Sequence, residues 1–241
     1  YCMFSKGKNP EFAVFGDSHA EHLFYGLAKN DSSSWMLMGN SSCAPVSGGV
    51  KVTGDVQNCD LRMGKTLDYL ARQPSIRQVV VSFFGNYAHT IAYAADHVAK
   101  NLGPNIVEIT GPSSAGEKRG DLFFYGLNAT ISRLEDAGKQ VILTIDVPEL
   151  PFFPKSCLGR PFSFSKNRCA IPLQEAMARQ EMIRGFVKKI QDLHPTVRVF
   201  DPQAIVCDAN QCYAQRDGIY LYRDSHHLSL RGSDLYARKF L

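Results

Sequence analysis

The feature that most constrains the fold of this 241-residue chain is the alternation of short apolar runs with longer segments of helical periodicity. Two of the apolar runs, QVVVSFF (78–84) and QVILTI (140–145), are typical of strands buried on both faces of a parallel sheet. We expect further strands at 11–15, 35–38 and 197–200, and helices at 18–29, 61–72, 120–137, 173–193 and 229–241. The pattern predicts an α/β fold, a three-layer αβα sandwich with a mostly parallel five-stranded sheet.

We interpret residues 1–241 as a single domain in which residues 147–172, with five prolines and a cysteine pair, form an ordered insertion.

The net charge of +4 is mild and Lys and Arg are scattered, so we predict no nucleic-acid partner. No run approaches the roughly 18 apolar residues of a membrane helix. The chain starts without an initiator Met or a signal-peptide pattern, so we expect it to be a fragment of a longer product, and an upstream membrane part stays open.

Cysteine usage indicates an oxidising compartment. Six of the seven cysteines fall into near-neighbour pairs within loop-like sequence: Cys43 with Cys59, Cys157 with Cys169, and Cys207 with Cys212. Such spacings fit local disulfides, and the alternative is a set of unrelated buried thiols. Cys2 is left over, and the lack of any C-x-x-C pair gives thiolate zinc sites little support.

The stretch VFGDSHAEH, directly after the first expected strand, has three interpretations. Asp17 or Ser18 can cap the helix that starts there. Asp17 and His19 can be the first ligands of a metallophosphoesterase, but the further Gly-Asn-His element of such a site is missing, so we predict no metal. Ser18 can be a nucleophile, provided that a base and an orienting acid come from elsewhere in the chain.

The base and the acid that Ser18 needs are found near the C-terminus, in RDSHHLSLRG. Asp224 and His227 are three residues apart, a spacing at which the carboxylate can hold Nδ1 of the imidazole while Nε2 faces a partner. The order Ser, Asp, His without Gly-x-Ser-x-Gly disfavours the usual strand-elbow hydrolase. This register selects His227, and we predict that His226→Ala retains substantial activity. His89, His97 and His194 show no partner pattern and are interpreted as structural or surface residues.

An acyl-transfer site also needs hydrogen-bond donors for the oxyanion. The loops after residues 15, 38 and 84 should meet at the carboxyl edge of the sheet. The candidate donors on them are the N–H of Ser18, the side-chain amide of Asn86, and either Gly39 or Ser42, between which the sequence does not choose. Phe83, Phe84 and Tyr87 are candidates for a sugar platform, although core packing is the better expectation for the two phenylalanines.

Together these motifs resemble the SGNH, or GDSL-type, hydrolase superfamily, and most closely the SGNH domains fused behind acyltransferase-3 membrane proteins. The features that carry the resemblance run over nearly the whole chain: Gly16-Asp17-Ser18-His19-Ala20, Ser42-Cys43-Ala44-Pro45, Gly85-Asn86, Val147-Pro148-Glu149, the Cys207/Cys212 pair, and Asp224-Ser225-His226-His227-Leu228-Ser229. The resemblance implies an SGNH hydrolase-like, flavodoxin-like fold. It also implies Ser18 as nucleophile, His227 as base, Asp224 as its partner and Asn86 as an oxyanion donor.

The resemblance further implies an O-acetyltransferase of bacterial surface polysaccharide, of the O-antigen or lipopolysaccharide type. In such proteins an acyltransferase-3 membrane domain of the same chain supplies the acetyl group from acetyl-CoA, so this domain is expected to bind no cofactor itself. The expected location is the periplasm, tethered to the inner membrane. Two alternatives stay open: a carbohydrate O-acetyl esterase with the same acyl-enzyme, and a catalytically silent sugar-binding domain.

Overall fold

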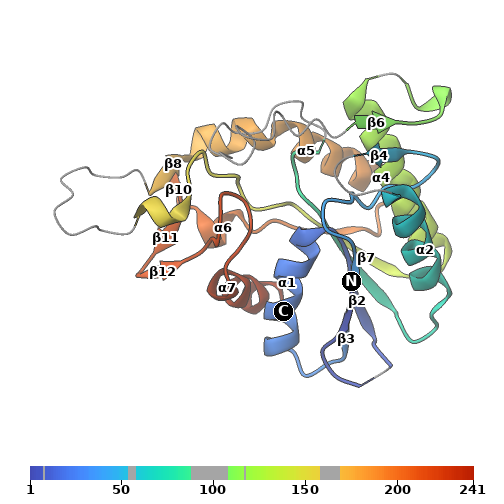
Figure 1. Cartoon of the computed structure of the whole chain (residues 1–241), viewed down its shortest axis with the longest axis horizontal. Helices are drawn as coiled ribbons and strands as arrows, with labels where there is room; N and C mark the ends of the chain where they lie inside the picture. Colours follow the sequence, from blue (N-terminus) through green and yellow to red (C-terminus); the bar gives the residue numbers. More distant parts are fainter. Residues whose placement is uncertain (8, 54–57, 88–107, 117, 158–168) are drawn as a thin grey trace.

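The computed structural model describes residues 1–7, 9–53, 58–87, 108–116, 118–157 and 169–241. Its centre is a six-stranded sheet of order β1-β3-β2-β5-β7-β9 (Figure 1). The strands are β1 (Cys2–Phe4), β2 (Phe12–Gly16), β3 (Trp35–Gly39), β5 (Gln78–Ser82), β7 (Gln140–Thr144) and β9 (Arg198–Phe200). Five of them pair in parallel, as the sequence predicts. The sixth, β1, was not predicted; it adds an antiparallel edge to β3.

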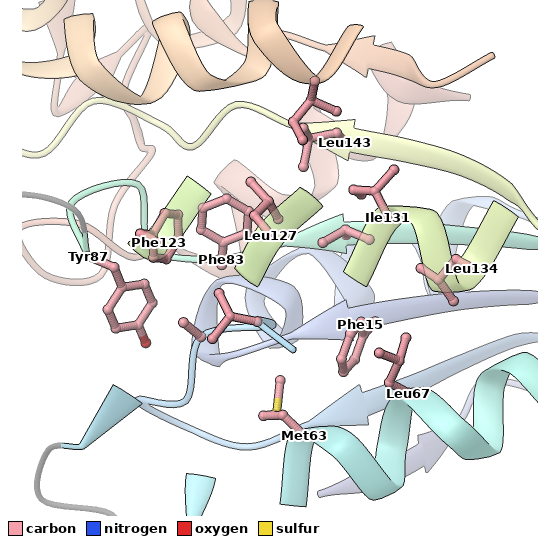
Figure 2. Close-up of a cluster of buried hydrophobic side chains, with 14 of the residues drawn as sticks. Phe15, Met63, Leu67, Phe83, Tyr87, Phe123, Leu127, Ile131, Leu134 and Leu143 are labelled. Atoms are coloured by element: carbon pink, nitrogen blue, oxygen red, sulfur yellow. The ribbon is translucent and has the colours of Figure 1, made fainter. Parts of the chain in front are cut away.

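Helices cover both faces of this sheet, which confirms the three-layer αβα sandwich. On one face, Val14, Val80 and Ile142 pack against α1 (Ser18–Asn30) and α7 (Leu230–Phe240). On the other face, the alternate strand residues pack against α2 (Cys59–Arg72), α4 (Arg119–Asp136) and α5 (Leu173–Leu193). Figure 2 shows this second interface, with Phe15 and Leu143 from the strands among leucines and isoleucine of the helices. The strands β2, β3, β5 and β7 are thus buried on both sides, which explains their continuous apolar sequences, whereas the edge strand β9 is only partly buried.

The remaining elements are short and lie around the central sheet. They are the pairs β4 (Lys51–Thr53) with β6 (Glu108–Thr110), β8 (Ala170–Pro172) with β10 (Gln211–Tyr213) and β11 (Gln215–Arg216) with β12 (Ile219–Tyr220), together with α6 (Gln203–Val206), η1 (Ser113–Ala115) and η2 (Pro154–Cys157). Of the expected insertion, residues 147–157 and 169–172 are described, and the others lie outside the described residues. No helix among the described residues is both long and apolar enough to cross a membrane.

Three disulfides join Cys43 to Cys59, Cys157 to Cys169 and Cys207 to Cys212. These are the pairs that the sequence predicts. Cys2 is exposed and takes part in none of them. The first bond attaches the loop after β3 to the start of α2.

Two glycines let the carboxyl ends of β2, β3 and β5 come together. Gly16 lies opposite both Gly39 and Ser82 in the sheet register. A Cβ at Gly16 would fall 1.7 Å from the carbonyl oxygen of Ser82, and a Cβ at Gly39 would fall 1.8 Å from that of Gly16. Only glycine fits at such close backbone approaches. The three loops that follow these strands therefore leave the sheet from one compact edge.

Candidate active site

Ser18, His227 and Asp224 form one hydrogen-bonded chain at this edge. Oγ of Ser18 lies 2.7 Å from Nε2 of His227, although the two residues are 209 positions apart. Nδ1 of His227 lies 2.8 Å from Oδ2 and 3.0 Å from Oδ1 of Asp224. All three residues are partly exposed. An imidazole held in this way can accept the hydroxyl proton, and the carboxylate stabilises the imidazolium that results.

The start of α1 positions Ser18. Asp17 is the N-cap, and its Oδ1 accepts the N–H of His19 at 2.8 Å. Its Oδ2 accepts the N–H of Phe84 at 3.0 Å, which links the loops after β2 and β5. Burial raises the pKa of Asp17 to about 6, against the hydrogen bonds from Phe84, Tyr87 and His19, which lower it. Asp17 is therefore the turn residue that the sequence predicts, and its two oxygens stabilise the strand–helix junction.

A tight turn positions His227. Oδ1 of Asp224 accepts the N–H groups of His226 at 3.1 Å and His227 at 2.7 Å, so the same carboxylate holds backbone and imidazole. Partial burial opposes ionisation of Asp224, but the hydrogen bond and charge of His227 outweigh it and lower the pKa of this carboxyl well below its usual range. Leu150, in the expected insertion, donates its N–H to the carbonyl of Ser225 at 2.7 Å, which attaches the insertion to the turn.

Two of the candidate oxyanion donors, Asn86 and Gly39, donate to other protein groups in this structure. Nδ2 of Asn86 donates to Oε2 of Glu149, which also accepts the guanidinium of Arg179. One of the two amide hydrogens of Asn86 is used in this way. The N–H of Gly39 donates to the carbonyl of Tyr1 at 3.2 Å. Ser42 is exposed and has a positive φ of 58°, a left-handed conformation in the loop after β3.

A second series of hydrogen-bonded side chains, Asp146–His19–His226, lies beside the first, and the sequence did not predict it. Nδ1 of His19 is 2.8 Å from Oδ1 of Asp146, and its Nε2 is 3.1 Å from Nδ1 of His226. Asp146 also accepts the N–H of Gly85 on Oδ2 at 3.0 Å and that of Val147 on Oδ1 at 2.8 Å. The only sequence signal for this chain was the position of Asp146, directly after an expected strand and thus at the carboxyl edge of the sheet.

Burial has the largest effect on the pKa values of Asp146 and His19. It raises the pKa of Asp146 to about 7, although the N–H groups of Gly85 and Val147 favour the ionised form. It lowers the pKa of His19 well below 6.5, and the neighbouring His227 and His226 act in the same direction. His19 is therefore neutral at physiological pH.

Two groups of side chains among the described residues could hold a metal ion by geometry alone. They are His19 with His226 and His227, and His19 with His22 and Asp146, each with ligand atoms within 4.8 Å of one another. Both depend on His19, whose ring nitrogens already contact Asp146 and His226. Neither of these two groups of described residues includes Asp17.

The other aromatic and histidine candidates that the structure describes pack against other protein side chains. Phe83 and Tyr87 are buried in the core, whereas Phe84 is half-buried with its ring against His19 and His226, at centroid distances of 5.1 and 4.9 Å. His194 pairs with Glu135 and Asn128 in a contact between α4 and the end of α5. His89 and His97 lie outside the described residues.

The comparisons with known proteins agree with this architecture. The family model of the SGNH domain that is fused to AT3 domains matches residues 1–241. The chain is an SGNH-type enzyme domain, and it belongs to the family of SGNH domains fused to AT3 domains. No curated protein matches the sequence.

Two solved structures share the fold. The lipopolysaccharide acetyltransferase periplasmic domain of Salmonella ser. Paratyphi A is 18% identical with a TM-score of 0.63, over 97% of this chain and 83% of that one. A GDSL-like lipase from Bacteroides thetaiotaomicron is 13% identical with a TM-score of 0.50, over 97% of this chain and 87% of that one. At these identities the likeness concerns the fold alone.

Proposed function

We propose that this chain is an O-acetyltransferase domain that carries an acetyl group on Ser18 and transfers it to a hydroxyl of a bacterial surface polysaccharide of the O-antigen or lipopolysaccharide type. The observation that carries the proposal is the Ser18–His227–Asp224 hydrogen-bonded chain, in a domain whose family is fused to AT3 domains. The neighbouring structure described as a lipopolysaccharide acetyltransferase periplasmic domain supports the substrate class.

In the acylation step, Oγ of Ser18 attacks the carbonyl carbon of the acetyl donor while its proton moves to Nε2 of His227. The tetrahedral oxyanion is stabilised by the N–H of Ser18 at the start of α1, by the second amide hydrogen of Asn86 and by a group of the loop after β3. The bond from the carbonyl carbon to the donor atom then breaks. His227 returns the proton to the leaving donor, which leaves acetyl-Ser18.

In the transfer step, a sugar hydroxyl occupies the place of the departed donor. Its oxygen attacks the acetyl carbon and its proton moves to Nε2 of His227. The bond between the carbonyl carbon and Oγ breaks, and Oγ takes the proton back from His227. The products are the acetylated sugar and free Ser18. Water in place of the sugar gives hydrolysis, so the same residues serve a carbohydrate O-acetyl esterase.

The family fusion implies the source of the acetyl group. An AT3 membrane domain in the same chain would take it from acetyl-CoA on the cytoplasmic side, and this domain would act in the periplasm, where the three disulfides are stable. Each proton in the two steps is moved by Ser18 and His227. The proposed chemistry therefore needs neither a metal nor a cofactor bound by this domain.

Intact mass spectrometry after incubation with p-nitrophenyl acetate tests the acyl-enzyme. We expect one acetyl adduct, mapped to Ser18, in the native protein and none in Ser18→Ala. Ser32→Ala, which removes an exposed hydroxyl elsewhere, should keep the adduct and serves as the matched control. An adduct that persists in Ser18→Ala would contradict the nucleophile, and no adduct or turnover in the native protein would favour a silent binding domain.

A second experiment separates transfer from hydrolysis. The protein is incubated with an acetyl donor and de-O-acetylated polysaccharide, and in parallel with the naturally acetylated polysaccharide. Acetyl gain on the first, measured by mass or NMR, supports the transferase. Acetyl loss from the second without gain on the first supports the esterase instead. Ser18→Ala provides the background for both measurements.

A further inference from the structure

We propose that His22 is a positioning residue for the base: its imidazole holds the main chain directly after His227 and so keeps the base within reach of Ser18. The inference deepens the proposed function and rests on it, because it concerns the residue that moves the proton in both steps. His22 transfers no proton itself. It acts through the backbone of Leu228, the residue that follows the base.

Helix α1 carries both the nucleophile and His22. Ser18 is the first residue of the helix and His22 lies four positions later, so the two side chains share one face and are about one turn apart. Oγ of Ser18 contacts Nε2 of His227 at 2.7 Å. Nδ1 of His22 accepts the N–H of Leu228 at 3.2 Å. One face of α1 therefore contacts both the side chain of the base and the backbone next to it.

The contact with Leu228 determines the tautomer of His22. A backbone N–H can only donate, so Nδ1 of His22 accepts and carries no proton. The ring is consequently neutral, with its proton on Nε2. Burial lowers the pKa of His22 well below 6.5, and the neighbouring His19 and His227 act in the same direction. A neutral ring adds no positive charge beside the imidazolium that forms on His227 during the reaction.

The bond to His22 differs from the other backbone bonds around the base. The N–H of His227 donates to Oδ1 of Asp224 at 2.7 Å, and its carbonyl accepts the N–H of Arg223 at 2.9 Å. Those two bonds fix the turn within itself. The bond from Leu228 to His22 instead fixes the turn to α1, and thus to the helix that carries the nucleophile.

Both members of this contact are buried, so its loss has no simple remedy. Leu228 is 2% exposed and His22 is 4% exposed. The ring of His22 also meets that of His227 edge to face, at a centroid distance of 6.0 Å. Without the acceptor, a buried N–H is left unpaired, and the turn must shift to pair it with water. The base then moves away from Ser18, and a displacement of about 1 Å is enough to lower the rate about 100-fold.

Variants that place the acceptor at different points test this role. In His22→Asn, the amide oxygen is as many bonds from Cα as Nδ1 of histidine, so it can accept the N–H of Leu228. In His22→Gln the amide lies one bond further out. We expect His22→Asn to keep kcat for p-nitrophenyl acetate within about 3-fold, and His22→Gln and His22→Leu to lower it about 10- to 100-fold. KM should change by less than about 2-fold, because His22 acts on the base and not on substrate binding.

A packing role for His22 predicts the opposite order. Glutamine is close to histidine in volume, whereas asparagine is smaller and leaves a cavity at a buried site. We therefore expect His22→Asn to be the less stable and the more active of the two in thermal unfolding and kinetics. His22→Gln with the higher kcat would overturn the role. His194→Asn, in the contact between α4 and α5, should keep the native kcat and is the matched control.

Nitrogen-15 NMR of histidine-labelled native protein tests the contact without relying on a variant that folds poorly. Above neutral pH, the ring of His22 should show an unprotonated Nδ1 and a protonated Nε2. Its signals are assigned by their loss in His22→Asn or, if that variant does not fold, in His22→Gln. A protonated Nδ1 in the native protein would overturn the inference, because that nitrogen could not accept the N–H of Leu228.

The outcomes distinguish this role from the proposed function. If the native protein forms acetyl-Ser18 but passes the acetyl group only to water, the transferase proposal fails and the role of His22 stands, because both reactions use His227. If all three His22 variants keep the native kcat, the role of His22 is overturned while acyl transfer by Ser18 remains. Inactivity of the native protein on every ester defeats both.

Discussion

Gly26 of α1 and Ser233 of α7 are in direct contact where the two helices cross. Oγ of Ser233 accepts the N–H of Gly26 at 2.8 Å, and a Cβ on Gly26 would fall 2.1 Å from the carbonyl oxygen of Ser233. Helix α1 begins at Ser18, and α7 begins three residues after His227. The approach of these two helices therefore holds the hydroxyl and the imidazole within hydrogen-bond distance.

Gly26→Ala should separate α1 from α7. The added methyl group overlaps backbone atoms, which cannot move as a side chain can, so we expect a loss of about 2–3 kcal/mol in the free energy of unfolding. Esterase activity on p-nitrophenyl acetate should fall as well, because Ser18 and His227 lie on the two displaced elements. Gly185→Ala, where a Cβ meets nothing within 4 Å, is the control and should stabilise α5 by about 0.5–1 kcal/mol. Gly26→Ala with native stability and activity would contradict this role for the helix crossing.

Asp224→Asn should lower the kcat for p-nitrophenyl acetate by about 1,000-fold or more. An amide cannot stabilise the imidazolium, and it favours the wrong tautomer of His227. His227→Ala should lose at least as much activity, and the double variant little more than either single variant, because the residues act as one unit. The exposed Asp217→Asn is the matched control. Additive losses in the double variant would show that Asp224 and His227 act independently.

Asn86→Ala should lower kcat by about 100-fold with little change in KM, the expected cost of one oxyanion donor. Glu149→Ala should reproduce part of this loss, because Glu149 holds the amide of Asn86. It should also destabilise the domain, since it leaves the largely buried Arg179 without this carboxylate. Steady-state kinetics of both variants, with the exposed Glu181→Ala as control, measures these effects. A change confined to KM would show that Asn86 contributes to binding rather than to the oxyanion.

The Cys43–Cys59 disulfide should contribute about 3 kcal/mol to stability, as expected for a closed loop of about 15 residues. The bond spans 16 positions and attaches the loop after β3 to α2. Replacing both cysteines by alanine should lower the free energy of unfolding by this amount in urea titrations. The Cys207–Cys212 bond closes a loop of only 5 positions, so its removal should cost less. A larger loss of stability on removing Cys207–Cys212 than on removing Cys43–Cys59 would contradict this account.

Asp234 should make the stability of the domain depend on acid pH. The hydrogen bond from Asn30 lowers the pKa of Asp234 from 3.8 to about 2 against burial, and Lys29 and Arg238 act in the same direction. Because the folded pKa lies below the unfolded one, this stabilisation is present above pH 4 and is lost as the pH falls towards 2. Asp234→Asn should lower the free energy of unfolding at pH 7. Between pH 4 and 2 the variant should then lose less stability than the native protein does. Thermal unfolding measures both, with the exposed Asp192→Asn as control.

The sequence predicted most of the parallel sheet because its strands are buried on both faces. The runs at 78–84 and 140–145 became β5 and β7, within two residues at their ends. Strand β1 was not predicted, because three residues at an exposed edge carry no periodic pattern. Its pairing with β3 arises from backbone hydrogen bonds between distant segments.

Within the site, the spacing of residues in the sequence predicted part of the Ser18–His227–Asp224 arrangement. Asp224 and His227 are close in the chain, so their pairing depends on one turn, and the helix start at Ser18 follows from its own sequence. The meeting of Asp146, His19 and His226 depends on the order of the strands and on the crossing of α1 with α7. The sequence alone therefore determined the alternation of elements, the local cysteine pairs and the Ser–Asp–His candidates. Only the tertiary structure decided which side chains face His226 and which atoms hold Asn86, because those contacts join segments that the chain separates and only packing brings together.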